Sequence, residues 1–283
     1  MHFTTWDIVI LSIFAVILLV LLMYRQARRF KIRHIIVKSD ISKDDKQKIK
    51  FMHLSDIHVG RLYIKTEDII KVLIAEKPLF IAFTGDYCEK ESEIPIFIEF
   101  VNKLSKAAPK IPFYFTFGNH DVKDIFSKRA DARQSFVDLI EDISENMHVL
   151  ENDYSTLQTP QGKCIIGGLG DSRSNVGNIP ELVSKWRKPG IPLILLCHNA
   201  DITFKLELGS ADLLICGHTH GGQIWLPFKL EFYIFHKDET PKKGLIHGEH
   251  IFKGIPIYIN SGLGCTSLPL RLFSISEIVI IEI

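Results

Sequence analysis

Five short apolar segments of this chain end in side chains that can bind a metal ion or transfer a proton. They read IKFMHLSDIH, LFIAFTGD, IPFYFTFGNH, IPLILLCH and ADLLICGHTH. Each is rich in β-favouring residues and almost continuously apolar, which is typical of strands buried on both faces of a parallel sheet. Ligands of such sheets gather outside the carboxyl ends of the strands. The sequence therefore predicts that one edge of a sheet collects the polar residues at these ends: Asp56, His58, Asp86, Asn119, His120, His198, His218 and His220.

Longer stretches with a helical pattern separate the apolar segments. Alternation of short strands with helices is the signature of an α/β domain. The expected helices are Thr66–Glu76, Ile94–Ser105, Ala130–Asn146 and Pro180–Arg187. Because the chain contains neither a low-complexity tract nor an internal repeat, we expect one domain over residues 34–283.

An uncharged apolar run, Ile8–Met23, precedes this domain. It is close to the length of a bilayer-spanning helix, and Trp6 and Tyr24 flank it. A signal peptide would have basic residues before the run and a small-residue cleavage site after it, whereas here Asp7 precedes the run. A buried helix of a soluble protein would rarely be apolar on every face over this length.

Basic residues follow the run, at Arg25, Arg28, Arg29, Lys31 and Arg33. Since positive charge stays on the cytoplasmic side, we expect residues 1–33 to form an uncleaved single-pass anchor in the cytoplasmic (inner) membrane, with the domain in the cytoplasm. The same basic cluster would then lie against anionic headgroups.

Charge and cysteine content narrow the function further. The net charge of +1 and the lack of a basic stripe give no reason to expect a nucleic-acid partner. The five cysteines form no CxxC pair and mostly lie in apolar runs, which is typical of buried free thiols in a reducing compartment. We expect none of them to act as a nucleophile.

The polar strand ends offer carboxylate, carboxamide and imidazole groups but no thiolate. A structural zinc site needs four ligands, usually Cys and His, so this set is too large and too rich in oxygen. Two metal ions about 3.5–4 Å apart, with one carboxylate between them, fit the set better. Mixed imidazole and oxygen donors suit Mn²⁺, Fe or Zn²⁺ better than Ca²⁺ without choosing among the three, and we expect Mn²⁺.

The order of these segments resembles that of the calcineurin-like metallophosphoesterase superfamily. From Ser55 onward the chain carries SDIH, TGD, GNHD, CHN and GHTHGGQ in the superfamily's order. The GHTHGGQ form, the N-terminal anchor and the late GLGCTSLPLR are most similar to a membrane-associated bacterial branch. The resemblance implies a two-sheet α/β sandwich flanked by helices, and hydrolysis of a phosphoester or pyrophosphate at a binuclear metal centre.

The resemblance also implies which residues bind each metal. The first metal would be bound by Asp56, His58, Asp86 and His220. The second would be bound by Asp86, Asn119, His198 and His218, with Asp86 as the bridge.

His120 would be the catalytic residue, protonating the leaving oxygen or stabilising charge on it. Superfamily members often orient this histidine with an aspartate three residues after the bridging one. Here that position is Glu89, and Asp121 is a second candidate for the orienting role. Arg61 and Arg271 could grip a substrate phosphate, because guanidinium groups match phosphate geometry, or could equally be ordinary surface charges.

Three other features have a structural interpretation beside a functional one. We expect His53 to pack or pair within its strand rather than bind metal. HGEH, residues 247–250, imitates a metal motif but lies in a charged, glycine-containing segment, so we expect a solvated loop. PFKLEFYIF, residues 227–235, is expected to be an ordinary strand or core segment; the alternative is a surface that meets lipid or acyl chains.

The predicted membrane anchor indicates a class of substrate. A tether helps most when the substrate is itself confined to the bilayer, so we expect a phosphorylated small molecule that is lipid-linked. Membrane-anchored relatives include enzymes that cleave UDP-2,3-diacylglucosamine in lipid A biosynthesis, a reaction of the cytoplasmic leaflet. The alternatives are a phosphodiesterase or phosphomonoesterase on soluble substrates, a nuclease, which the charge disfavours, and a non-catalytic metal-binding scaffold, which predicts missing ligands.

Overall fold

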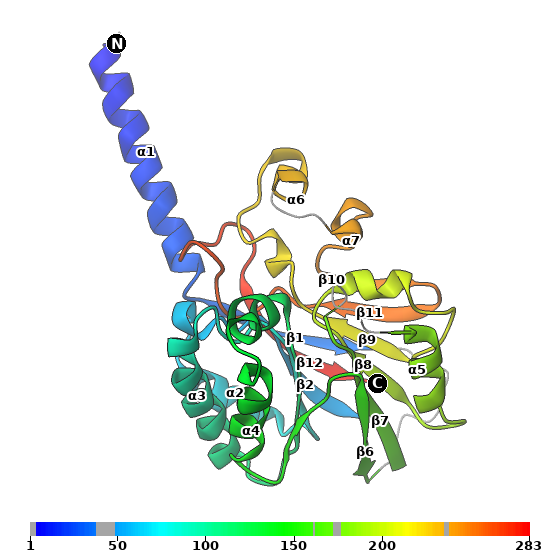
Figure 1. Ribbon diagram of the computed structural model, residues 1–283. Coiled ribbons are helices and arrows are strands. Elements are labelled where there is room, and N and C mark those ends of the chain that lie inside the picture. Colours follow the sequence, from blue (N-terminus) through cyan, green and yellow to red (C-terminus); the bar gives the residue numbers. More distant parts are fainter. Residues whose placement is uncertain (1–3, 38–48, 161, 172–176, 235–237) are drawn as a thin grey trace.

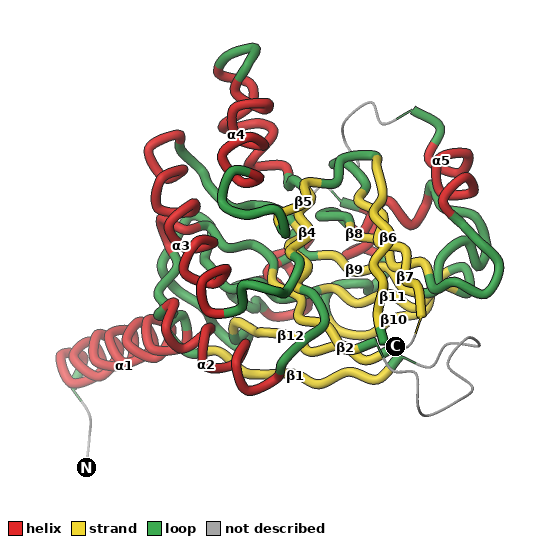
Figure 2. Tube along the Cα trace, turned by 90° about the horizontal axis from the view of Figure 1, so that it is seen from below, coloured by secondary structure: helices red, strands yellow, loops and turns green. Residues whose placement is uncertain are grey.

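The computed structural model describes residues 4–37, 49–160, 162–171, 177–234 and 238–283. Two six-stranded sheets pack face to face and carry helices on their outer faces (Figures 1 and 2). This is the two-sheet α/β architecture that the resemblance implied, and one long apolar helix precedes it.

The first sheet has the strand order β1-β12-β2-β3-β4-β5. Strands β2 to β5 run parallel, β12 is antiparallel to β2, and β1 is parallel to β12. The strands are β1 (Phe30–Ile36), β12 (Ser276–Glu282), β2 (Lys50–Leu54), β3 (Ile81–Thr84), β4 (Phe113–Thr116) and β5 (Met147–Val149).

The second sheet has the order β10-β11-β9-β8-β7-β6. Strands β11, β9, β8 and β7 run parallel, and the two edge strands are antiparallel to their neighbours. The strands are β10 (Gly248–Phe252), β11 (Ile255–Ile259), β9 (Leu213–Cys216), β8 (Leu193–Leu196), β7 (Gly162–Gly168) and β6 (Asp153–Thr159).

An apolar layer lies between the two sheets. Phe51 and Tyr114 enter it from the first sheet, and Ile166 and Leu196 from the second. Helices cover the outer faces, so β2, β3, β4, β8 and β9 are buried on both sides. This double burial is the physical reason for their nearly continuous apolar sequences.

Four helices flank the sheets as expected. On the first sheet lie α2 (Thr66–Glu76), α3 (Ile94–Ala107) and α4 (Ala132–Glu141), and on the second lies α5 (Ile179–Trp186). The ends agree with the sequence expectation within two residues, except that α4 ends five residues before the predicted end. It ends early because the chain turns at residues 144–146, where the Met147 N–H donates to the Ser144 carbonyl at the start of β5.

Helix α1 (Thr5–Gln26) projects from the domain, as Figure 1 shows. The mean hydropathy of its apolar window is 2.8, and by length and composition the helix could be a membrane span or a signal sequence. Its last turn contacts the domain. The Arg271 N–H donates to the Met23 carbonyl (3.2 Å), and the Phe273 N–H donates to Gln26 Oε1 (2.8 Å).

The basic residues after α1 are not all available to a membrane surface. β1 begins at Phe30, so the first sheet already includes residues that precede position 34. Lys31 Nζ and Arg33 Nε lie 3.5 and 3.4 Å from Glu277 Oε2, a carboxylate that is 1% exposed. Lys31 and Arg33 therefore compensate the buried negative charge of Glu277, which limits their availability to lipid headgroups.

Two of the segments with alternative interpretations differ from expectation. Residues 227–234 form a 3₁₀ turn (Pro227–Lys229) followed by the short helix α6 (Leu230–Ile234), so the prediction of a strand was wrong; Phe232 is buried, Phe228, Leu230 and Ile234 are exposed, and residue 235 lies outside the described residues. Residues 248–250 of HGEH belong to edge strand β10 and not to a loop. Between these segments lies helix α7 (Glu239–Lys242).

Replacing Phe83 by alanine should destabilise the domain by about 3–5 kcal/mol, because a large cavity replaces the ring. The Phe83 ring is fully buried and stacks on Phe115 with centroids 4.6 Å apart. Leu208 is 80% exposed, so Leu208→Ala should change stability by less than about 0.5 kcal/mol. Urea unfolding of the full-length protein in detergent micelles measures the free energy of unfolding of both variants. Similar decreases in this free energy for Phe83→Ala and Leu208→Ala would contradict the packing described.

Candidate metal centre

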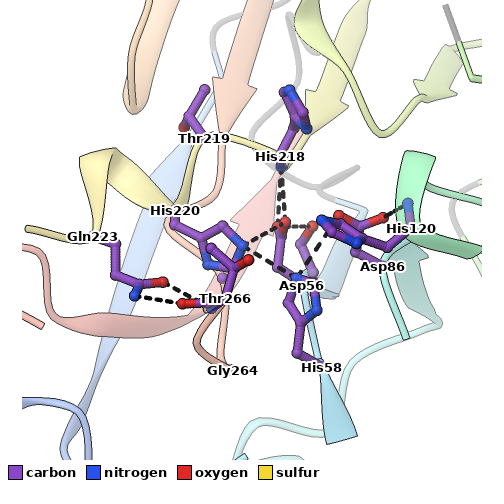
Figure 3. Close-up of polar contacts among 12 residues, drawn as sticks. Asp56, His58, Asp86, His120, His218, Thr219, His220, Gln223, Gly264 and Thr266 are labelled. Atoms are coloured by element: carbon purple, nitrogen blue, oxygen red, sulfur yellow. Dashed lines mark hydrogen bonds and ion pairs between the residues drawn. The ribbon is translucent and has the colours of Figure 1, made fainter. Parts of the chain in front are cut away.

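The predicted strand ends converge at one edge of the two sheets. β2, β3 and β4 of the first sheet and β8 and β9 of the second all point their carboxyl ends toward this edge, although they span residues 50–216. Figure 3 shows side chains from several of these loops meeting there. Two groups of possible ligands result, each with its ligand atoms within 4.8 Å of one another.

The first group consists of Asp56, His58 and His220, all buried. The Nε2 atom of His220 lies 3.2 Å from Nε2 of His58 and 3.4 Å from Oδ1 of Asp56 (Figure 3). One carboxylate oxygen and two imidazole nitrogens thus point at a common centre.

The second group consists of Asp86, His198 and His218. His198 Nε2 lies 3.0 Å from Asp86 Oδ2 and 3.3 Å from His218 Nδ1. The same Asp86 oxygen lies 3.7 Å from His58 Nε2 of the first group. Asp86 therefore contacts both groups, which is the geometry that a bridging carboxylate requires.

Two observations fit a pair of cations between these residues. In each group two imidazole nitrogens lie 3.2 or 3.3 Å apart beside a carboxylate oxygen, so three possible ligand atoms surround one point. Asn119 Oδ1 is buried and has no hydrogen-bond partner among the described residues. Buried polar atoms are normally paired, so an unpaired acceptor beside two His/Asp groups is explained by a bound ion.

The backbone at this edge is strained. Five of the seven predicted ligands have positive φ angles: Asp56 (50°), His58 (39°), Asp86 (56°), His218 (74°) and His220 (49°). Side chains other than glycine rarely adopt this conformation, and residues held in it cluster at functional sites. The strain aims the side chains inward, and Gly221 and Gly222 (φ 56° and 86°) let the chain turn away after His220.

Glycines beside the ligands allow close approach. A Cβ atom on Gly217 would lie 1.8 Å from Ser55 Oγ and 2.3 Å from Asp56 Oδ2. One on Gly118 would lie 2.2 Å from Asp86 Oδ1. The strand ends therefore pack so tightly around the two aspartates that only glycine fits at these positions.

Asp121 holds two ligand-bearing loops together. Its carboxylate accepts hydrogen bonds from the backbone N–H groups of Asp86 (2.8 Å), Tyr87 (2.9 Å) and Gly118 (2.9 Å). Burial, and secondarily the charge of Asp86, raises the pKa of Asp121 to about 6. Burial also acts to raise the pKa of Asp86 itself, but His198 holds that pKa well below its usual value.

His120 is oriented by a residue that we did not anticipate. Its Nδ1 atom lies 2.7 Å from Asp124 Oδ2, one turn further along a π-helical segment, Asp121–Ile125. The two expected partners have other contacts: Glu89 pairs with His58 and Arg61, and Asp121 accepts hydrogen bonds from backbone N–H groups. The spacing of His120 and Asp124 in the sequence GNHDVKD was the available signal, since residues four apart lie on one helical face.

Glu89 instead supports a ligand of the first group. Its Oε1 atom lies 3.3 Å from His58 Nδ1, and its other oxygen pairs with Arg61. This contact with His58, with burial opposing it, lowers the pKa of Glu89 to about 2. A carboxylate on the second nitrogen fixes the orientation of a metal-binding imidazole. Arg61 is thus committed to Glu89 rather than presented to a substrate.

Arg271 does not face a substrate, contrary to one expectation. The side chain is fully buried, and Nη1 donates to the carbonyl of Ser261 (2.9 Å) while Nη2 donates to that of Gly264 (2.5 Å). Its Nη2 also lies 3.3 Å from His220 Nδ1. Arg271 thus packs behind His220 and holds the loop of residues 261–274, because carbonyl oxygens of that loop accept hydrogen bonds from both Nη atoms.

Asp238 was also not predicted from the sequence. Its Oδ2 atom lies 2.9 Å from His218 Nε2, and its Oδ1 accepts a hydrogen bond from Asn199 Nδ2 (2.8 Å). Asp238 thus orients the ring of His218, whereas Nδ1 of His198 lies 2.6 Å from the Thr84 carbonyl oxygen. No local motif marks Asp238, because it lies 18 residues after the last predicted ligand.

The centre opens into a cavity of about 720 Å³. Asp86, Asn119 and the three histidines His120, His218 and His220 line its floor. The glutamine of GHTHGGQ holds one wall, because Gln223 Oε1 accepts from the Thr266 N–H (2.8 Å) and Nε2 donates to the Thr266 carbonyl (2.9 Å), as Figure 3 shows. Further wall residues are Thr219, Gly222, Ile224, Glu231, Asp238, Ser267 and Leu268.

His53 and the cysteines, which were expected to have only structural roles, lie in the core. His53 is buried, its Nε2 lies 2.8 Å from Thr84 Oγ1, and burial lowers its pKa to about 3. All five cysteines are free and buried. Burial raises the pKa of the thiols of Cys164 and Cys197 to about 12, so they are not activated nucleophiles.

The chain belongs to the calcineurin-like phosphoesterase family, whose profile matches residues 49–222. It is a metal-dependent phosphoester hydrolase with two buried His/Asp groups consistent with a binuclear centre.

Three bacterial relatives are similar over most of their length. The uncharacterized metallophosphoesterase YkoQ of Bacillus subtilis is 28% identical over 90% of this chain and 90% of its own. The uncharacterized metallophosphoesterase YkuE of the same organism is 30% identical, covering 86% and 82%. The phosphodiesterase YaeI of Escherichia coli is 28% identical, covering 85% and 84%.

Gly217→Ala should abolish metal binding and hydrolysis, because the new methyl group would displace Asp56. Gly170→Ala is the matched control, since the nearest atom to its Cβ is a side-chain atom of Asn152 at 3.3 Å. Metal content by elemental analysis and turnover of a model diester are the measurements. Wild-type metal content in Gly217→Ala would show that Asp56 binds no metal.

Asp124→Asn and Glu89→Gln should have separable effects. Asp124 pairs with His120 and is in neither group of possible metal ligands, so Asp124→Asn should lower kcat by about 10²-fold or more with unchanged metal affinity. Glu89 contacts His58, so Glu89→Gln should weaken metal binding by about 10–100-fold. Titration with Mn²⁺ followed by kinetics at saturating metal distinguishes them, and loss of metal affinity in both variants would refute the assignment.

Proposed function

We propose that this chain is a membrane-anchored hydrolase that cleaves phosphodiester or pyrophosphate bonds at a binuclear metal centre. The observation that carries the proposal is the pair of His/Asp groups joined by Asp86 on the floor of a cavity that also contains His120. A non-catalytic scaffold would have no need of the solvent-facing His120–Asp124 pair, whose side chains are 28% and 29% exposed.

Asp56, His58, His220 and Asp86 would hold one cation, and Asp86, Asn119, His198 and His218 the other. Divalent cations in such sites supply a water of lowered pKa and neutralise negative charge on a phosphoryl group. His120 then donates a proton to the leaving oxygen, with its ring held by Asp124. Glu89 and Asp238 keep His58 and His218 in the orientation that ligation needs.

Preference for a diester is supported by the similarity to the E. coli protein named a phosphodiesterase. The cavity, at about 720 Å³, has room for a group on each side of a phosphate, which a monoester does not need.

The location at the cytoplasmic face of the membrane is supported by the apolar helix α1 and by the basic residues that follow it. A bilayer-confined substrate gains most from such a tether. A lipid-linked phosphate or pyrophosphate is therefore the substrate class that we propose, and UDP-2,3-diacylglucosamine, a substrate of lipid A biosynthesis, is one member of it.

The proposal is tested with the full-length protein in detergent and a panel of a monoester, a soluble diester, a nucleotide pyrophosphate and UDP-2,3-diacylglucosamine. Chelator-treated protein should be inactive, and Mn²⁺, Fe or Zn²⁺ should restore turnover, with Mn²⁺ expected to be most effective. Asp86→Asn and His120→Ala should each lower kcat by about 10²-fold or more.

His250→Ala is the matched control, because this histidine lies on edge strand β10 and contacts the His247 carbonyl rather than the centre. It should retain wild-type turnover. Exclusive turnover of the monoester would overturn the proposed bond class, and turnover that persists in chelator and in Asp86→Asn would overturn the metal-dependent mechanism.

A further inference from the structure

The domain carries a patch of exposed apolar side chains next to the cavity. Its members come from the segment before and within α6 and from the loop of residues 261–274. Phe228 is 91% exposed, Phe273 66% and Ile234 62%. We name as the apolar rim the set Trp225, Phe228, Leu230, Ile234, Leu268 and Phe273. Large aromatic and aliphatic side chains gathered in this way usually mark a contact with a partner or a membrane.

The apolar rim is continuous with helix α1. The Phe273 N–H donates to Gln26 Oε1 in the last turn of that helix. The centroid of the Phe273 ring lies 6.3 Å from that of the Trp225 ring, and the backbone N–H of Trp225 donates to the Leu272 carbonyl. α6 also lies on the side of the domain toward which α1 projects, at the top of Figure 1. A membrane that contained α1 would therefore meet the rim as well.

The backbone is strained where it exposes Phe228 of the apolar rim. Phe228 and Lys229 both have φ angles of 59°, in the left-handed region that bulky side chains avoid. The strained turn leaves the Phe228 ring in solvent, where it gains no packing. Such strain persists where it serves a function, and an aromatic ring beside a lysine is typical of the interface between lipid headgroups and acyl chains.

We propose that the apolar rim docks on the lipid bilayer and holds the mouth of the metal-centre cavity at the headgroup level. The proposal rests on the proposed anchoring by α1, and it specifies how the domain is oriented once anchored. Docking by Phe228, Leu230 and Ile234 adds a second attachment to α1, which restricts rotation of the domain about the helix.

The rim and the cavity share a wall. Leu268 belongs to both, and Ile224 lines the cavity next to Trp225 of the rim. Glu231 of α6 is buried, lines the cavity and accepts a hydrogen bond from the Leu226 N–H (2.9 Å). A docked rim would thus present the cavity to the phosphate of an amphiphile whose acyl chains stay in the bilayer.

The test uses the full-length protein in nanodiscs of phosphatidylethanolamine and phosphatidylglycerol. Phe228→Cys is labelled with an environment-sensitive fluorophore, which is selective because all five native cysteines are buried. Leu208→Cys is the matched control, since Leu208 is 80% exposed and precedes β9, at the end of the sheet opposite the metal centre. Emission at residue 228 should shift to the blue and be quenched by spin-labelled lipid, whereas emission at residue 208 should do neither.

Equal, water-like emission at both positions would overturn the proposal. Shielding of residue 228 in dilute detergent as well as in nanodiscs, rising with protein concentration, would overturn it too, because it would show that a second copy covers the rim. A further variant, Phe228→Asp, should keep turnover of a soluble diester and lose turnover of a bilayer-embedded amphiphile. Because soluble turnover reports the metal centre alone, failure of the docking proposal is distinguishable from failure of the proposed function.

Discussion

The contact on which the rest of the structure depends is that of the buried Asp86 carboxylate with histidines from both sheets. Asp86 leaves β3 of the first sheet, while His198 leaves β8 of the second, and their side chains meet at 3.0 Å. A carboxylate that is 1% exposed is costly unless positive charge surrounds it. Three features bring the carboxylates and imidazoles together at this edge of the sheets. They are the packing between the sheets, the left-handed backbone at the strand ends and the glycines beside the two aspartates.

Much of this arrangement could be predicted from the sequence because its signals are local. Strands buried on both faces read as apolar runs, and their polar ends stood out against them; the four flanking helices followed from periodicity. The supporting contacts could not be predicted in the same way. Asp238 reaches His218 from an irregular segment, and Arg271 turns inward, where four carbonyl groups of its own loop accept hydrogen bonds from its Nη atoms. Such roles depend on tertiary packing, which short motifs do not encode.

The carboxylate that orients His120 differs from the one expected. The carboxylate three positions after Asp86 was expected to orient His120, but the side chain of Glu89 pairs with His58 and Arg61. His120 is served instead by Asp124 on the adjacent π-helical segment. The segment after GHTHGGQ was misjudged because its apolar, aromatic composition suits a core strand, whereas the structure forms a 3₁₀ turn and a short helix that expose Phe228, Leu230 and Ile234 and bury Phe232.

The arrangement of the two His/Asp groups requires two cations that share Asp86. Equilibrium dialysis of the full-length protein against Mn²⁺, followed by elemental analysis and electron paramagnetic resonance, is the decisive measurement. We expect two Mn²⁺ per chain with the spectrum of a magnetically coupled pair, and loss of that coupling in Asp86→Asn. A single Mn²⁺ per chain, or two uncoupled ions whose spectrum is unchanged in Asp86→Asn, would rule out a shared carboxylate.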